Sequence, residues 1–181
     1  KTFYKNILKE MAEKEGVLSD TKYTEYSKLI LTVTSMGKDA RSIGGYNLFK
    51  PLANYGKVKK QGAEGAIWAL LAVNSNSSYT FPKTETGTQT TKKKLVEYIL
   101  KQQISNGGFS NNGKTGNVNL TAKALQALAP YYDSRKDVKS SVDKAIEYLS
   151  KKQKDNGGFT SGGVVNSESS SQVITALTSL G

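Results

Sequence analysis

Residues 144–159 read KAIEYLSKKQKDNGGF, and this stretch decides the fold. An earlier stretch, from Lys94 to Phe109, repeats its spacing 50 residues before. The matched positions are Tyr98 and Tyr148, Gln103 and Gln153, Gly107 and Gly157, and Phe109 and Phe159. Repetition at a fixed period of this size is typical of stacked supersecondary units. The sequence therefore predicts an array of helical pairs.

Each copy of the stretch begins as an amphipathic helix. In the later copy Val142, Ala145, Ile146 and Leu149 recur at helical spacing, while charged side chains occupy the other face. Residues 156–158 read Asn-Gly-Gly, which accept the positive φ that a helix C-terminus needs. We expect the helix to end there.

A second kind of helix alternates with the first. It is apolar over most of its circumference, which predicts burial on more than one side. Four such helices are expected, at 29–37, 66–73, 122–129 and 173–181. The amphipathic helices are expected at 3–14, 46–55, 87–103 and 138–153, with a capping box at 86–89 and an N-cap at Ser19 or Asp20. The pairs form four approximate repeat units, 1–37, 46–75, 87–132 and 138–181.

The repeated motif resembles a known one. The spacing Lys144-Ala145-x2-Tyr148-Leu149-x3-Gln153-x3-Gly157-x-Phe159 is similar to the glutamine–tryptophan repeat of squalene and oxidosqualene cyclases, with Phe in place of Trp. The resemblance implies an all-α fold, a partial α/α toroid of antiparallel helical hairpins with alternating inner and outer helices. More closely, the chain resembles prenyltransferase-like repeat domains of secreted and surface proteins from Gram-positive bacteria. More distantly, it resembles the helical domain of intrinsic factor and transcobalamin.

The resemblance also bears on domain organisation and location. Length alone predicts one domain over residues 1–181. A complete toroid of this kind has about six hairpins, whereas four inner helices are expected here. The last four residues, 178–181, match residues 34–37, after which the chain enters another outer helix, so we expect a fragment of a longer chain with further domains. No apolar run approaches the ~20 residues that span a bilayer, and we expect a secreted or surface-attached protein, not a transmembrane one.

Composition excludes several kinds of chemistry. The chain has no His and no Cys, so it cannot assemble a disulfide, a zinc site of ordinary ligands or a triad that needs imidazole. We expect no metal and no cofactor. The formal net charge of +11 suits a polyanion such as an anionic cell-wall polymer. The cations are spread over many helices, so we expect no specific nucleic-acid site.

The cyclase resemblance implies an acidic motif, Asp-x-Asp-Asp-Thr-Ala, at the start of an inner helix. This chain has Asn117, Asn119 and Leu120 in place of the three acids. An amide cannot donate a strongly acidic proton, and we interpret Asn119 as a helix N-cap. At the sister position of the next repeat, Glu168 is the one weak candidate for a catalytic residue. The alternative is that Glu168 only favours the positive end of the helix dipole.

Aromatic residues near the loops are candidates for lining a ligand cavity, because concave binding sites are rich in aromatic side chains. The candidates are Tyr26, Trp68, Phe109 and Phe159, together with Asn119. The alternative interpretation is structural. Phe109 and Phe159 then staple neighbouring hairpins and Trp68 belongs to the core, which leaves Tyr26 free.

Three functions stay open at this point. The first is a non-catalytic binding or structural module of a secreted or surface bacterial protein. The second, which the transcobalamin resemblance implies, is binding of a corrinoid or another hydrophobic small ligand, without an imidazole ligand because His is absent. The third is a terpene-cyclase-like enzyme, which the missing acids disfavour.

Overall fold

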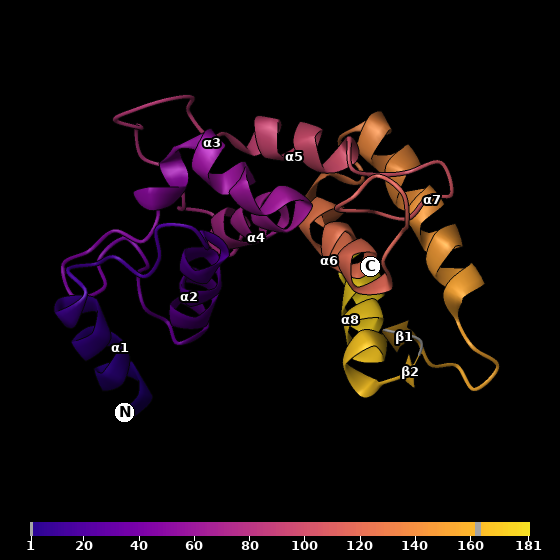
Figure 1. Ribbon diagram of the computed structural model, residues 1–181, viewed down its shortest axis with the longest axis horizontal. Helices are drawn as coiled ribbons and strands as arrows, with labels where there is room; N and C mark the ends of the chain where they lie inside the picture. Colours follow the sequence, from indigo (N-terminus) through magenta and orange to yellow (C-terminus); the bar gives the residue numbers. More distant parts are fainter. Residues whose placement is uncertain (1, 162–163) are drawn as a thin grey trace. The chain divides into compact units, whose positions relative to one another are not determined.

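The computed structural model describes residues 2–161 and 164–181, which Figure 1 shows as a ribbon. The chain forms two compact units that divide between Leu95 and Val96. Helices build both units, and the described residues contain a single sheet, a two-stranded hairpin. The predicted all-α fold of the toroid kind is confirmed. No helix among the described residues is long and apolar enough to cross a membrane.

The first unit is built around two helices, α2 and α4, that pack along each other. Its elements are α1 (Thr2–Glu13), α2 (Thr24–Ser35), η1 (Pro51–Ala53), α3 (Tyr55–Val58), η2 (Lys59–Gln61), α4 (Gly62–Asn74) and the start of α5 (Lys92–Leu100). Helix α4 is buried along most of its length, as its nearly continuous apolar sequence predicts. Gly65 is required there because the Val58 carbonyl occupies the place of a β carbon.

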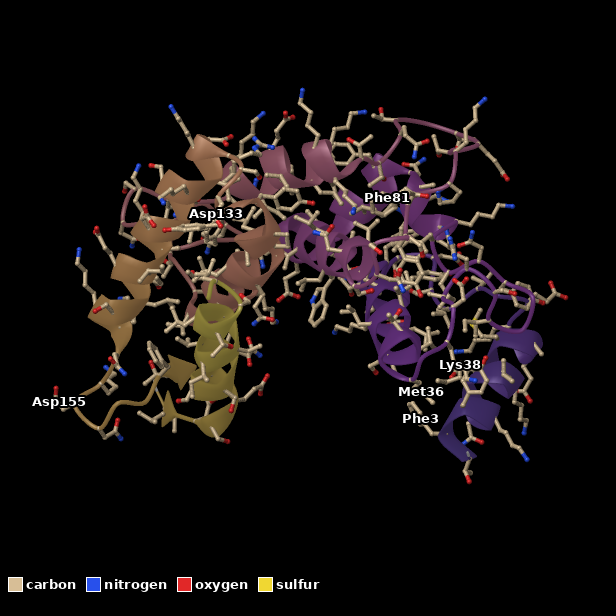
Figure 2. The ribbon with its side chains drawn as sticks, turned by 180° about the vertical axis from the view of Figure 1, so that it is seen from behind. Phe3, Met36, Lys38, Phe81, Asp133 and Asp155 are labelled. Atoms are coloured by element: carbon tan, nitrogen blue, oxygen red, sulfur yellow. The ribbon has the colours of Figure 1, made fainter. Side chains whose placement is uncertain are left out.

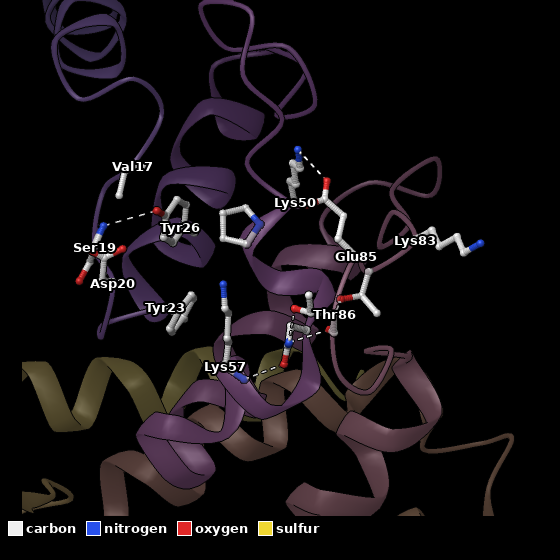
Figure 3. A pocket seen from close by; sticks show the side chains of 13 residues that line it. Val17, Ser19, Asp20, Tyr23, Tyr26, Lys50, Lys57, Lys83, Glu85 and Thr86 are labelled. Atoms are coloured by element: carbon white, nitrogen blue, oxygen red, sulfur yellow. Dashed lines mark hydrogen bonds and ion pairs between the residues drawn. The ribbon is translucent and has the colours of Figure 1, made fainter.

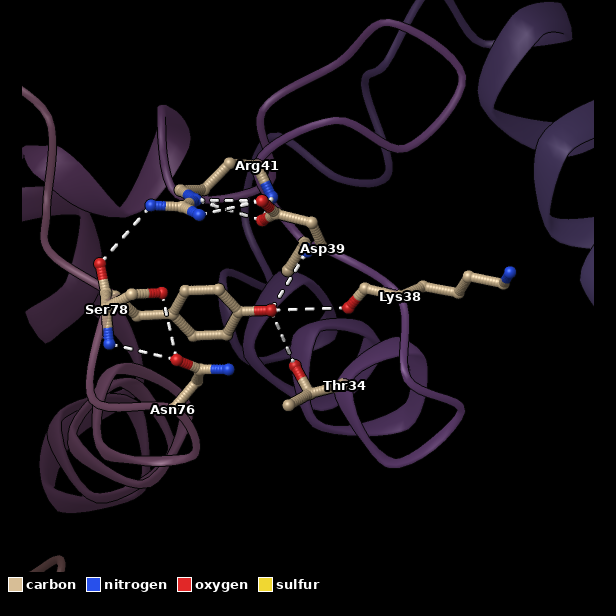
Figure 4. A network of polar contacts seen from close by, with 8 residues as sticks. Thr34, Lys38, Asp39, Arg41, Asn76 and Ser78 are labelled. Atoms are coloured by element: carbon tan, nitrogen blue, oxygen red, sulfur yellow. Dashed lines mark hydrogen bonds and ion pairs between the residues drawn. The ribbon is translucent and has the colours of Figure 1, made fainter.

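Tyr79 joins the loop after α2 to the loop after α4 (Figure 4). Its ring packs against that of Phe49, with ring centres 5.0 Å apart. Its hydroxyl accepts a hydrogen bond from the Ala40 N–H at 3.0 Å and lies 3.1 Å from the Thr34 hydroxyl oxygen. Lys38 supplies a further acceptor, its carbonyl, at 3.3 Å. The buried phenol therefore fixes the turn that follows α2.

The amphipathic helix predicted over 46–55 is wrong. The segment is instead a series of turns that ends in the short 3-10 helix η1. Pro51 is the first residue of η1, and a proline further inside an α-helix would remove one hydrogen bond and clash with a preceding carbonyl. The Asn47 side chain also accepts from the Phe49 N–H at 2.9 Å, which stabilises a turn.

The helix predicted over 87–103 begins only at Lys92, and the capping box at 86–89 is absent. Residues 88–90 run extended beside residues 53–55, with hydrogen bonds from the Tyr55 N–H to the Thr88 carbonyl and from the Thr90 N–H to the Ala53 carbonyl, both 2.8 Å. The Gln89 side chain is engaged elsewhere, because its Oε1 accepts from the Thr84 N–H at 2.8 Å. The cap of α5 is Thr91, whose hydroxyl accepts from the Lys94 N–H at 3.2 Å.

The second unit repeats one architecture twice. After the rest of α5 come α6 (Val118–Leu128), η3 (Ala129–Tyr131), α7 (Lys136–Lys152), β1 (Thr160–Ser161), β2 (Val164–Val165) and α8 (Ser167–Thr178). Helix α6 packs against both α7 and α8. The loop that leaves α7 carries Asp155 (Figure 2) and returns through the hairpin to α8.

Burial of α8 on more than one side, as predicted from its sequence, is wrong. Val173 and Ala176 are buried, but Ile174 and Leu177 on another face are 61% and 42% exposed. By contrast, α6 buries Leu125 and Leu128 completely. The difference arises because α6 has helices α7 and α8 packed beside it, whereas α8 packs mainly on α6.

Candidate functional site

The first turns of α6 and α8 are built as structural joints. Asn117 caps α6, with its Oδ1 accepting from the Leu120 N–H at 2.9 Å, and Asn166 caps α8 in the same way, accepting from the Ser169 N–H at 2.8 Å. Both have the extended backbone of an N-cap residue. The place where the cyclase resemblance implies acids is therefore occupied by caps.

A hydroxyl in each first turn also holds the loop that carries the repeated phenylalanine. The Thr121 hydroxyl accepts from the Phe109 N–H at 2.9 Å, and the Ser170 hydroxyl accepts from the Phe159 N–H at 3.1 Å. The same hydroxyls donate to the carbonyls of Asn117 and Asn166. This joint occurs twice with equivalent residues, so it belongs to the repeat itself.

The N-cap role predicted for Asn119 is wrong, because Asn117 has it. Asn119 lies within α6 and is half-buried, and its Oδ1 is buried without a hydrogen-bond partner among the residues that the structure describes. The signal that could have identified the cap is positional. Asn117 precedes Thr121 by the same interval as Asn166 precedes Ser170, whereas Asn119 has no asparagine counterpart.

Glu168 lies exposed in the first turn of α8. Its Oε1 accepts a hydrogen bond from the Gln172 amide one helical turn later, at 3.2 Å. Within the described ranges, no group of three His, Cys, Asp or Glu side chains is arranged to hold a metal ion. The arrangement around Glu168 is that of an exposed helix residue.

The predicted cavity aromatics separate into different environments. Phe109 is fully buried in the core of the second unit, whereas Phe159 is 6% exposed and borders an apolar groove. Trp68 lies half-buried on α4, with the Lys28 ammonium 5.2 Å from its ring centre. The expectation that Tyr26 is free is wrong, since its ring is buried and its hydroxyl accepts from the Leu18 N–H at 2.9 Å.

Tyr26 nevertheless borders a pocket of about 250 Å³ in the first unit (Figure 3). We call it the lysine–tyrosine pocket, and we define it by Tyr23, Tyr26, Lys50, Lys57 and Lys83. Asp20 and Glu85 also line it, so the lining contains three lysines and two acidic residues. Sequence reasoning missed the pocket because its residues come from three distant segments, of which only the lysine run 57–60 is conspicuous.

Side-chain contacts order the pocket. Lys50 is paired with Glu85 at 3.0 Å. The Lys57 and Lys60 ammonium groups each lie 5.8 Å from the centre of the Tyr23 ring, within the range of cation–π attraction. Asn54 closes one wall, because its side chain donates to the Thr86 carbonyl at 2.8 Å and accepts from the Lys57 N–H at 3.2 Å. Contacts within the protein therefore hold the Tyr23 and Asn54 walls of the pocket.

The second unit contains an apolar groove of about 380 Å³ between α7 and α8. We call it the α7–α8 groove, and its apolar lining is Ile146, Leu149, Phe159, Val173, Ile174 and Leu177. Gln153 and Gly157 of the repeated motif lie at its edge. Of the candidate cavity residues predicted from the sequence, Tyr26 and Phe159 thus border hollows, in different units.

Comparison with known proteins agrees with this architecture. The model of the prenyltransferase alpha-alpha toroid domain family matches residues 52–179. Searches of curated proteins and of solved structures give no significant match. The matched residues include both copies of the repeated motif, helix α4, and the helices α6 and α8. The chain belongs to the prenyltransferase α/α toroid domain family.

Proposed function

We propose that the chain is a non-catalytic binding module of a secreted or surface-attached bacterial protein, and that its ligand is an anionic cell-wall polymer. The observation that carries the proposal is the lysine–tyrosine pocket, whose lining combines lysine, asparagine and tyrosine side chains. Ammonium groups bind phosphodiesters through charge and hydrogen bonds, and the net charge of +11 attracts a polyanion over longer distances.

The size of the pocket supports a polymer over an enclosed small molecule. Its volume of about 250 Å³ is below the ~300–1,000 Å³ of pockets that enclose a drug-sized ligand. One phosphate unit of an extended chain fits such a hollow while the rest of the polymer passes outside. A corrin ring needs a larger enclosure, so the corrinoid alternative has no support from this pocket.

The N-termini of helices α6 and α8 support a role without catalysis. Asn117 and Asn166 form backbone caps at the positions where a cyclase needs acids, and Glu168 is exposed. A carboxyl group surrounded by water is not held in the enclosed, fixed position that a proton donor to an alkene needs. A secreted or surface location is supported by the absence of cysteine together with the resemblance to bacterial surface proteins.

The test is a titration with a poly(glycerol phosphate) chain at low and high salt. The double variant Lys57→Gln/Lys83→Gln should bind about 30-fold more weakly, since each of the two phosphate contacts is worth on the order of 1 kcal/mol. The matched control is Lys139→Gln/Lys151→Gln, which removes the same charge from the second unit and should change the affinity by less than about twofold. Lys139 also lies against a tyrosine ring, at 4.7 Å, so the control reproduces that environment.

The contrary outcomes are distinct. Equal weakening in both double variants would mean that the polymer only responds to total charge. Tight binding of cobalamin with no polymer binding would favour the small-ligand alternative. Product formation from squalene or a shorter isoprenoid would favour the enzyme.

A further inference from the structure

Asparagine followed by glycine occurs three times in the chain, at Asn106, Asn112 and Asn156. In this dipeptide the glycine nitrogen can attack the side-chain amide of the asparagine, because no β carbon shields the nitrogen or restricts the backbone. Asn106 and Asn156 belong to the two copies of the repeated motif, whereas Asn112 lies in the loop that joins α5 to α6. The structure distinguishes the three dipeptides through the hydrogen bonds of the atoms that would react.

The dipeptide at Asn106 is held on both sides of the bond that would form. The Gly107 N–H donates to the Ile104 carbonyl at 2.9 Å. The Asn106 Oδ1 accepts from the Gly108 N–H at 3.0 Å. The Lys144 carbonyl of α7 also fills the place that a β carbon would take at Gly107, which leaves this glycine no room to turn. We therefore expect Asn106 to react slowly in the folded chain.

The dipeptide at Asn156 makes the same turn with looser packing. The Gly157 N–H donates to the Lys154 carbonyl at 2.7 Å. The Asn156 Oδ1 accepts from the Gly158 N–H at 3.1 Å. In the described part of the chain, the atom nearest to the place of a β carbon at Gly157 is the Gln153 amide nitrogen, at 4.0 Å. Hydrogen bonds rather than packing hold this dipeptide, and its attacking nitrogen is engaged.

The dipeptide at Asn112 differs in both atoms that react. Within the described ranges, the Gly113 N–H donates to no protein group, and no atom beyond its chain neighbours lies within 4 Å of the place of a β carbon. The Asn112 Oδ1 accepts three hydrogen bonds, from the Ser110 hydroxyl at 2.8 Å and from the Lys114 and Thr115 N–H groups at 2.9 and 3.2 Å. Attack at Cγ places negative charge on this oxygen, and donors already aimed at it stabilise that charge.

We propose that Asn112–Gly113 is a site at which the folded chain modifies itself, converting the asparagine into aspartate or isoaspartate. The Gly113 nitrogen gives up its proton to hydroxide and forms a bond to the Asn112 Cγ. The side-chain nitrogen takes a proton from water and leaves as ammonia, so that a five-membered succinimide ring remains. Water then adds to one of the two ring carbonyls and opens the ring. The reaction needs no oxidant or reductant, and it is independent of polymer binding in the first unit.

The loop can take up the modification without loss of the fold. Residues 111–115 all lie exposed. The end of the loop is anchored separately, because the Asn117 N–H donates to the Phe109 carbonyl at 2.9 Å and the Asn117 side chain caps α6. Isoaspartate adds one carbon atom to the backbone of the exposed segment, and either product replaces a neutral amide by a carboxylate. We therefore expect the modified chain to remain folded, with its net positive charge lowered by one.

The test follows all three dipeptides in one sample, kept folded at mildly alkaline pH. Peptide mapping by mass spectrometry measures the conversion at each asparagine, and the chain in guanidinium chloride gives the rates without structure. In the folded chain Asn112 should react at least about tenfold faster than Asn106 and Asn156, and no more slowly than in guanidinium chloride. A rate at Asn106 or Asn156 that equals that of Asn112, or protection of Asn112 by folding, would overturn the proposal.

Variants of the same loop test the chemistry. Ser110→Ala removes one donor to the Asn112 oxygen and should slow the reaction there at least about threefold, with the rate at Asn156 unchanged. Asn112→Gln should abolish conversion in the loop, because glutamine cannot form the five-membered ring. Asn111→Gln is the matched control, since Asn111 is equally exposed and precedes no glycine, and it should retain the conversion. Unfolding curves show that the variants are folded. Conversion in the loop that survives Asn112→Gln, or a rate at Asn112 that Ser110→Ala does not lower, would refute the proposal.

Discussion

Gln103 and Ser141 join the loop after α5 to helix α7 by two hydrogen bonds, one from the Gln103 amide to the Ser141 carbonyl and one from the Ser141 hydroxyl back to Gln103. The same amide also donates to Gly107, at 2.8 Å. Gln103, a residue of the repeated motif, thus connects one repeat to the next. We call this connection the Gln103 latch. Its stability contribution can be measured directly.

We expect Gln103→Ala to lower the free energy of unfolding by about 2 kcal/mol, because it leaves the nearly buried Ser141 hydroxyl without its partner. Gln102→Ala is the matched control. Within the part of the chain that the structure describes, the Gln102 side chain bonds only to the Tyr98 carbonyl in the last turn of α5, at 3.2 Å, and its loss should cost less than about 0.5 kcal/mol. Urea unfolding measures both, and equal losses would contradict the role of Gln103 as a latch.

The two motif phenylalanines should differ in their contribution to stability. Phe109 is fully buried, and Phe109→Ala should cost about 3–5 kcal/mol. Phe159 borders the α7–α8 groove, where its surroundings are open on one side, so Phe159→Ala should cost clearly less. Urea unfolding of both variants measures the difference. A Phe159→Ala loss as large as that of Phe109→Ala would mean that the groove is closed in solution.

The sequence predicts the fold where the repeat is regular and fails where local chemistry intervenes. The match between residues 94–109 and 144–159 predicts the helix–turn–inner-helix unit, and the structure confirms it with α5, α6, α7 and α8. Helix α4 follows from its unbroken apolar run. The segment 46–55 departs from the pattern because Pro51 starts a 3-10 helix and the Asn47 side chain holds a turn.

The sites are less predictable because they depend on distant contacts. The sequence predicts Asn119 as the cap of α6, whereas Asn117 has the extended backbone and the side-chain hydrogen bond of an N-cap. Tyr26 looks free in the sequence, yet two backbone N–H groups that precede α2 use its hydroxyl. The lysine–tyrosine pocket joins residues 17–26, 50–57 and 83–86, a proximity that no local pattern encodes.

Tyr79→Phe should lower the free energy of unfolding by about 1–3 kcal/mol, because it removes the buried hydroxyl that the Ala40 N–H uses as acceptor. Tyr132→Phe is the matched control. The Tyr132 hydroxyl bonds to Asp143 at 2.9 Å in an exposed setting, so its loss should cost less than about 0.5 kcal/mol. Thermal unfolding compares the two variants. Equal shifts in Tm would show that the network in Figure 4 contributes nothing beyond its ring packing.

Acid should weaken the fold partly through Asp137 at the start of α7. A side-chain hydrogen bond from Arg135, aided by the Val138 N–H, lowers the pKa of Asp137 below its ordinary 3.8. A lowered pKa in the folded state stabilises the protein above the unfolded pKa, and this stabilisation is lost as the pH falls through the folded value. The pair is largely exposed, so the effect should stay below about 1 kcal/mol. In the wild type, the free energy of unfolding should therefore fall between pH 5 and pH 2 by up to about 1 kcal/mol more than in Asp137→Asn. Urea unfolding at several pH values measures this difference.

Glu168 offers the sharpest test between a module and an enzyme. If it were a proton donor, Glu168→Gln would abolish turnover of squalene or a shorter isoprenoid, because the amide keeps the shape of the side chain and removes the acid. We expect instead that the wild-type chain forms no product, since Glu168 is exposed and bonded only along its own helix within the described residues. The substitution should then cost a few tenths to about 1 kcal/mol of stability, through the weaker interaction with the helix dipole. Glu147→Gln, on the exposed middle of α7, is the matched control and should cost less, because the dipole acts only near helix ends. Product from the wild type that disappears in Glu168→Gln, while Glu147→Gln retains it, would show that the chain is an enzyme.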